Sequence, residues 1–247
     1  MKSAYMAIDI ETTGLSPENS KMIEIGAIVM EGKREIARFS RLINPGERLS
    51  KYIIDLTGIT DCMLQNEATE QEVVSEFLDF CDKVMSCYEE SDIILGHNIA
   101  FDYSFLKTAS VKLKRSFERR AIDTLSIARK LHPELSSKSL ENMCKHYNIV
   151  REVSHRAFED AITASNLYEL MKNQYGEKEA QLFLPQAISY TPKKQEPMTW
   201  KQKKYLLDLV NYHQLEIPEN LDDFTKSKAS KYIDHIILEH GLLFRKS

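Results

Sequence analysis

The stretch AIDIETTGLS, residues 7–16, places two carboxylates, Asp9 and Glu11, in an otherwise apolar run. Alternate side chains of an extended chain share a face, so Asp9 and Glu11 project to one side of a strand and the neighbouring isoleucines to the other. Two like charges this close repel each other, and burial makes the repulsion worse. Because no lysine or arginine lies nearby in the sequence, the compensating positive charge must come from elsewhere.

A hard divalent cation would supply that charge, since Mg²⁺ and Mn²⁺ prefer carboxylate oxygens. The alternative is an acidic pair that caps or stabilises the turn at a strand end, where Gly14 breaks the apolar pattern. On these residues alone, both interpretations stand.

The composition is that of an ordinary globular protein. The 247 residues, 43% hydrophobic and 28% charged, suit one large domain or one domain with a small appendage. No apolar run is long enough to span a membrane, and Asp9 comes too early for a secretory signal, so we expect a cytoplasmic protein without a membrane partner. Four cysteines without CxxC spacing are expected to be reduced thiols: Cys62, Cys81, Cys87 and Cys144.

The net charge of −4 bears on possible partners. A protein that grips long stretches of nucleic acid by the backbone is usually basic, because phosphate neutralisation drives that binding. This chain should hold few phosphates by itself, or hold them through metal.

Hydrophobic periodicity predicts an α/β fold, a mixed sheet flanked by helices. Helical spacing follows a capping box at Thr69 and recurs over residues 101–109, 140–147 and 157–172. The five predicted strands are residues 4–11, 22–30, 35–43, 92–96 and 121–124.

The composition changes after Phe183. We therefore predict a main domain over residues 1–183, a proline-containing linker over 184–198 and a small helical module over 199–247. From Gln186 onward the chain carries ten Lys and Arg against eight Asp and Glu, a charge of +2.

The lysines of this module have three interpretations. They could guide substrate toward an acidic domain, or they could form the solvated faces of two amphipathic helices, which we favour. The third is a docking module for a polymerase, clamp or repair protein, with Trp200 and Tyr205 as anchors.

Three further residues are candidates for chemistry. Asp102, in GHNIAFD, follows a buried strand, where α/β folds place their sites. Asp160, in HRAFED, opens a predicted helix, and His155 precedes it by five residues. Five residues rotate by about 140° on a helix, so both side chains cannot share a helical face. We therefore expect His155 on the loop before the helix, after Ser154, and Asp160 pointing inward.

Three motifs together resemble one enzyme family. DIETTGL (9–15), HNIAFD (97–102) and HRAFED (155–160) occur in the order of the DEDD superfamily of 3′→5′ exonucleases. The histidine before the last aspartate is similar to the DEDDh branch, which includes the proofreading epsilon subunit of bacterial DNA polymerase III. The resemblance covers about the first 175 residues and departs from the family pattern slightly, at Ile99.

The resemblance implies an RNase H-like fold, two divalent cations (Mg²⁺ or Mn²⁺) and release of nucleoside 5′-monophosphates from a 3′ end. The metal ligands would be Asp9, Glu11, Asp102 and Asp160. His155 would be the general base, since an ordinary histidine pKa near 6.5 suits proton transfer near neutral pH. Residues implied to contact or support the terminal nucleotide are Thr12, Thr13, Gly14, Leu15, His97, Asn98 and Phe101. Of these, Leu15 and Phe101 would pack against its base, whereas His97 and Asn98 would mainly support their neighbours.

Two alternatives stay open. A non-catalytic nucleic-acid binder on the same fold predicts loss of an acid or of the histidine, and all five are present. An RNA-trimming enzyme would differ from a DNA exonuclease in one side chain that admits the 2′-hydroxyl of RNA instead of excluding it. The sequence does not identify that side chain. We expect single-stranded DNA as the preferred partner, with RNA as the alternative.

Overall fold

The computed structural model describes residues 4–88, 92–151, 155–193, 196–217 and 221–243, and it divides into two compact units, Met1–Pro192 and Lys193–Ser247. Ser154 and parts of the predicted linker and module, residues 194–195, 218–220 and 244–247, lie outside the described residues.

The first unit is built on a six-stranded mixed sheet with the order β3-β2-β1-β4-β5-β6. β1, β4 and β5 are parallel neighbours, and the other pairs are antiparallel. The strands are β1 (Ala4–Thr12), β2 (Met22–Glu31), β3 (Arg34–Leu42), β4 (Ile93–Gly96), β5 (Arg120–Asp123) and β6 (Gln186–Ala187).

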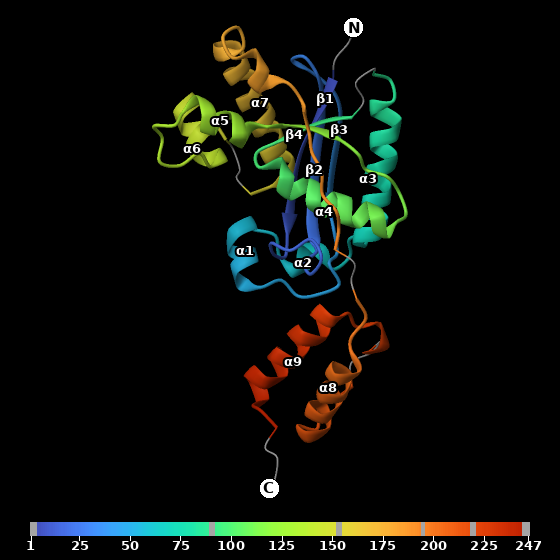
Figure 1. Cartoon of the computed structure of the whole chain (residues 1–247). Coiled ribbons are helices and arrows are strands. Elements are labelled where there is room, and N and C mark those ends of the chain that lie inside the picture. The colour runs from blue at the N-terminus through green and yellow to red at the C-terminus, as the bar shows by residue number, and fades with distance from the viewer. Residues whose placement is uncertain (1–3, 89–91, 152–154, 194–195, 218–220, 244–247) are drawn as a thin grey trace. The chain divides into compact units, whose positions relative to one another are not determined.

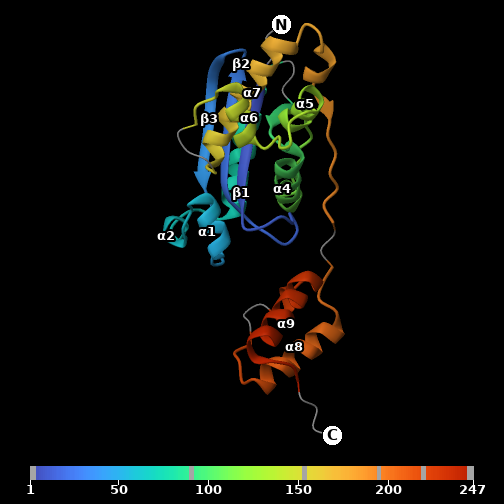
Figure 2. The same ribbon diagram turned by 90° about the vertical axis from the view of Figure 1, so that its left-hand side faces the viewer.

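Helices cover both faces of this sheet (Figures 1 and 2). The helices of the first unit are α1 (Lys51–Thr57), α2 (Asp61–Leu64), α3 (Glu70–Met85), α4 (Ile99–Lys112), α5 (Thr124–Leu131), α6 (Leu140–Tyr147) and α7 (Ala157–Tyr175), with a 3₁₀ turn at Ala180–Phe183. α3 and α4 pack on one face around Phe77 and Tyr103, and α7 packs on the other around Leu167 and Met171. The predicted α/β, RNase H-like sheet flanked by helices is confirmed.

The alternation of β1 decides which face receives which residues. Met6, Ile8 and Ile10 belong to the core under α3 and α4, whereas Tyr5 and Ala7 belong to the core under α7. Since alternate residues share a face, Asp9 and Glu11 point to the α7 side. The predicted separation of the two acids from the isoleucines is therefore confirmed.

The predicted elements correspond to observed ones, with additions. The five predicted strands are present, and the Thr69 capping box forms at the start of α3 as expected. The sixth strand, β6, lies inside the predicted linker and pairs with β5, so residues 184–198 are divided between the two units. α1, α2 and α5, of four to eight residues each, were not among the predicted helices.

The second unit contains α8 (Trp200–Tyr212), a 3₁₀ turn (Leu221–Asp223) and α9 (Lys226–His240). Its helices pack on each other around Leu206, Leu209, Phe224 and Ile233, and a capping box forms at Thr199. All four cysteines of the chain are free. None of the helices in the described parts of the chain is long and apolar enough to cross a membrane.

Candidate active site

Four acidic side chains converge from three elements at one end of the sheet. Asp9 and Glu11 come from the last half of β1, Asp102 from the first turn of α4 and Asp160 from the first turn of α7. Asp102 and Asp160 are buried, and Asp9 and Glu11 are half-buried. The structure thus brings together all four carboxylates that the sequence motifs single out.

Asp102 is fixed against β1 by a backbone contact. The amide of Ile10 donates a hydrogen bond of 3.0 Å to its Oδ1. Because Ile10 lies between Asp9 and Glu11, this bond holds the α4 carboxylate beside the two acids of the strand.

The electrostatics of the cluster are those of crowded like charges. Burial, and next the charges of Asp102 and Asp160, raise the pKa of Asp9 well above its ordinary value. Burial raises the pKa of Glu11 to about 8, with Asp160 adding to it. Burial also raises the pKa of Asp102 to about 8, against the opposing effect of its backbone hydrogen bonds. Each carboxylate would therefore be stabilised by a nearby cation.

His155 completes the cluster from the loop before α7. It is exposed, its φ is +59°, and its backbone amide donates to Oδ2 of Asp160 at 3.3 Å. One ligand atom each from Glu11, His155 and Asp160 lies within 4.8 Å of the others. The expected placement of His155 before the helix, with Asp160 facing inward, is confirmed.

Two arginines bring positive charge to the cluster, which the sequence analysis did not foresee. Arg151 pairs with Oδ1 of Asp160. The guanidinium of Arg156 donates from Nη2 to the buried Glu24 of β2 at 2.9 Å. Its positive charge also opposes the burial that raises the pKa of Glu11. The sequence separates these arginines from β1 by more than a hundred residues, so only the fold reveals them.

Glu24 and Gly26 of β2 determine where α7 begins. Glu24 is 1% exposed, and it accepts from the amide of Ala157 at 3.0 Å as well as from Arg156. Gly26 lies opposite Asp9, and a Cβ placed on it would lie 2.1 Å from the backbone nitrogen of Phe158. The backbone of α7 therefore touches β2 directly, which places Asp160 beside the acids of β1. An acid and a glycine inside the apolar run MIEIGAIVM were the available signals.

The residues after Glu11 form the loop between β1 and β2. The hydroxyl of Thr12 donates to the carbonyl of Gly14 at 2.8 Å, and that of Thr13 donates to Glu47 at 3.2 Å. Leu15 is 86% exposed. The two threonine hydroxyls shape the loop, and Leu15 is free to meet a ligand.

The predicted contacts around α4 fall into two kinds. Both ring nitrogens of His97 have protein partners, the hydroxyl of Thr124 at 2.9 Å and the carbonyl of Lys138 at 2.7 Å. Asn98 is the N-cap residue of α4, with φ +74°, and its backbone N–H donates to Oδ1 of Asp123 at 2.8 Å. Both residues thus contact neighbouring protein groups, and the mainly supporting role expected for His97 and Asn98 stays a prediction. Phe101 is half-buried, with its ring centroid 5.0 Å from that of Phe105.

Comparison with known proteins identifies the first unit. The model of the family described as Exonuclease (RNase_T) matches residues 6–168. The DNA polymerase III PolC-type of Pediococcus pentosaceus is 38% identical over 164 residues, which are 66% of this chain and 11% of that protein. The chain spans about a tenth of the length of the curated relatives it matches.

Solved structures share the fold. E. coli Exonuclease I in complex with a dT13 oligonucleotide matches with a TM-score of 0.64 and 19% identity, over 74% of this chain and 44% of that one. The nuclease domain of 3′hExo, a DEDDh family member bound to rAMP, matches with a TM-score of 0.58 and 17% identity, over 70% and 93% of the two chains.

Proposed function

We propose that this chain, which belongs to the Exonuclease (RNase_T) family, is a metal-dependent 3′→5′ exonuclease of the DEDDh type that releases nucleoside 5′-monophosphates from single-stranded DNA. The observation that carries the proposal is a cluster of four electrostatically interacting carboxylates, three of them with raised pKa values, in which Glu11 and Asp160 offer ligand atoms within 4.8 Å of each other and of His155.

The donor set fits divalent cations. Asp9, Glu11, Asp102 and Asp160 offer the carboxylate oxygens that Mg²⁺ and Mn²⁺ prefer. Burial, and next the neighbouring negative charges, raise the pKa of Asp9 and Glu11, and a cation would offset both effects. Arg151 pairs with one oxygen of Asp160, Arg156 acts on Glu11 and the Ile10 amide donates to Asp102, so Asp9 is the least compensated member of the cluster. When bound, two such ions would lower the pKa of a water and stabilise the leaving oxygen.

The side chains have distinct roles in the proposed reaction. His155 would take the proton of the attacking water, since its ring lies near Glu11 and Asp160 and is open to solvent. Thr12, Thr13 and Gly14 would present the loop backbone to the terminal nucleotide. Leu15 and Phe101 would pack on its base, a contact that tolerates any sequence because every base has an apolar face.

The test is a comparison of matched DNA and RNA single strands carrying a 5′ label, in Mg²⁺ or Mn²⁺. We expect a ladder that shortens from the 3′ end, with faster turnover of DNA. Faster turnover of RNA would replace DNA by RNA as the substrate. Full-length strands after long incubation at high enzyme would support a non-catalytic binder and overturn the proposal.

A polymerase or repair-protein partner for the second unit rests on the polymerase names of the curated relatives, and the cytoplasmic location stays a prediction. If a chain truncated after Pro192 co-purified with the same proteins as the full chain, the docking role of residues 193–247 would be wrong.

A further inference from the structure

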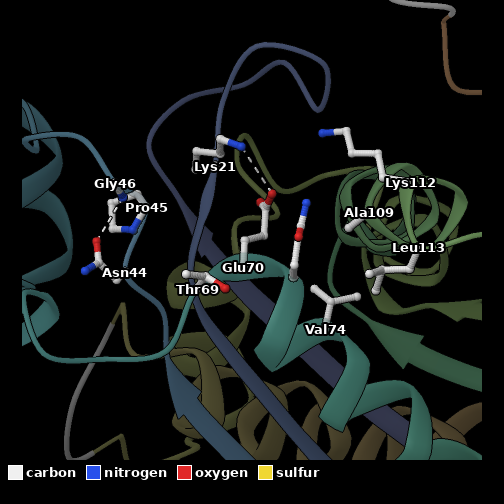
Figure 3. Close-up of a pocket in the computed structure, with 11 residues that line it drawn as sticks. Lys21, Asn44, Pro45, Gly46, Thr69, Glu70, Val74, Ala109, Lys112 and Leu113 are labelled. Atoms are coloured by element: carbon white, nitrogen blue, oxygen red, sulfur yellow. Dashed lines mark hydrogen bonds and ion pairs between the residues drawn. The ribbon is translucent and has the colours of Figure 1, made fainter. Parts of the chain in front are cut away.

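A pocket lies on the α3 and α4 side of the first unit, apart from the carboxylate cluster. Its volume is about 350 Å³, within the range of small-molecule sites. Figure 3 shows the lysine amines of Lys21 and Lys112 above it and the side chains of Val74, Ala109 and Leu113 along one wall. The pocket therefore combines cations on its rim with apolar contacts inside.

Glu70, which lines this pocket, and Glu18, which lies near Lys112, both already have partners. One oxygen of Glu70 accepts from the amide of Met22 at 3.0 Å, and the other accepts from Lys21 at 3.5 Å. Glu18, whose charge reaches Lys112, accepts from the hydroxyl of Tyr190 at 2.6 Å. The oxygens of Glu70 and Glu18 are therefore already engaged by groups other than Lys112.

Lys112 is the cation with spare binding capacity. Among the described residues it makes no hydrogen bond or ion pair, and Figure 3 shows its amine extending toward the Lys21–Glu70 pair. Loss of hydration lowers the pKa of this amine, and nearby Lys21 lowers it further against the opposing effect of Glu70. An anion between the two lysines would stabilise both charges.

The position of the pocket relates it to the path of a strand. Thr13 and Lys21 close the loop after β1, since the Thr13 amide donates to the Lys21 carbonyl at 2.8 Å. Lys112 ends α4, ten residues after Asp102, which is about 15 Å along the helix. A strand in B-form DNA rises about 3.4 Å per nucleotide and an extended single strand covers more, so this span corresponds to at most about four nucleotides.

We propose that this pocket is a second nucleotide subsite, which holds a nucleotide at most about four positions from the 3′ end, with its phosphate between Lys21 and Lys112 and its base or sugar against Ala109 and Leu113. The proposal rests on the proposed function, because it takes the 3′ end to lie at the carboxylate cluster. It adds a contact that a substrate of two nucleotides cannot make.

The test uses the full chain and its Lys112→Ala variant. Binding of fluorescent DNA of two and of eight nucleotides is measured by anisotropy in Ca²⁺ or EDTA, so the result does not depend on hydrolysis. We expect the variant to bind the octamer about 2- to 5-fold more weakly, as for loss of one exposed ion pair. From 50 to 200 mM salt, octamer affinity should fall about 2.6-fold less for the variant, the effect of one phosphate contact.

The controls separate a subsite from general attraction. Lys33→Ala removes an exposed lysine at the β2–β3 hairpin, at the other end of β2 from Lys21, and should leave octamer binding unchanged. In Mg²⁺, Lys112→Ala should raise KM for the octamer without changing kcat, and it should leave turnover of a dinucleotide unchanged.

Three results would overturn the subsite. These are unchanged octamer binding in Lys112→Ala, an equal loss in Lys33→Ala, and an equal loss for the dinucleotide. If Lys112→Ala weakened the binding of a free nucleoside 5′-monophosphate as much as that of the octamer, the pocket would be a site for released product. That result would also overturn the subsite. Absence of hydrolysis with length-dependent binding intact would contradict the proposed function and leave the subsite standing.

Discussion

Substitution of Gly26 by alanine should displace Asp160 from the other three acids. The added Cβ would lie 2.1 Å from the nitrogen of Phe158, whereas real Cβ contacts essentially never fall below 3.0 Å. The nearest atoms belong to the backbone of Ala157 and Phe158, so no side-chain rotation relieves the contact. The start of α7 must therefore move away from β2 by about 0.9 Å.

The size of the effect follows from this shift. A misplacement of about 1 Å at a reacting centre can cost roughly 100-fold in rate. Overpacking of this kind also costs about 1–3 kcal/mol of unfolding free energy, which a folded domain of this size can tolerate. We expect Gly26→Ala to fold, to melt at a lower temperature and to lose about 100-fold in kcat.

The assay measures kcat on a single-stranded oligonucleotide in Mg²⁺, together with the unfolding free energy from urea titration. Gly32→Ala is the matched control, because Gly32 has φ +60° and nothing within 4 Å of the added Cβ. It should lose about 1–2 kcal/mol through backbone strain and keep its activity. Full activity of Gly26→Ala, or an equal loss of activity in Gly32→Ala, would refute the reasoning.

Three further perturbations test other parts of the account. His155→Ala should lower kcat by about 10²- to 10⁴-fold, as for loss of a general base, and an unchanged pH–rate profile would remove His155 from the mechanism. In the folded protein Glu11 and Asp102 stay protonated up to about pH 8, whereas in the unfolded chain they lose their protons near pH 4. The unfolding free energy of the metal-free protein should therefore fall from pH 5 to pH 8. Calorimetry should show that Mg²⁺ raises Tm more at pH 8 than at pH 5, and an equal rise would contradict this. Tyr190→Phe, which removes the 2.6 Å bond to Glu18 in the loop after β1, should raise KM more than it lowers kcat, and unchanged kinetics would exclude a positioning role for Tyr190.

The site could be predicted from sequence where its signals are local. The alternation of charged and apolar residues around Asp9 and Glu11 gives the shared face directly, because the side-chain period of a strand is two. The five-residue spacing of His155 and Asp160 gives the loop and helix placement, because the helical period excludes a common face. Both placements depend on backbone geometry within a few residues.

The parts that could not be predicted depend on contacts across the fold. Glu24 and Arg156 are 132 residues apart, and no pattern in one sequence pairs them. From the sequence, Gly26 is a residue that weakens a strand, and only the structure shows that the backbone of α7 packs against it. The strand β6 has two residues, too few for any periodicity, and it forms because β5 offers an open edge.

The most direct test of the metal-dependent site is diffraction from crystals soaked in Mn²⁺ with a nucleoside 5′-monophosphate, recorded at the manganese edge. Two anomalous peaks about 3.5–4 Å apart, surrounded by the oxygens of Asp9, Glu11, Asp102 and Asp160, are the predicted result. A carboxylate cluster without manganese in such crystals would contradict the account.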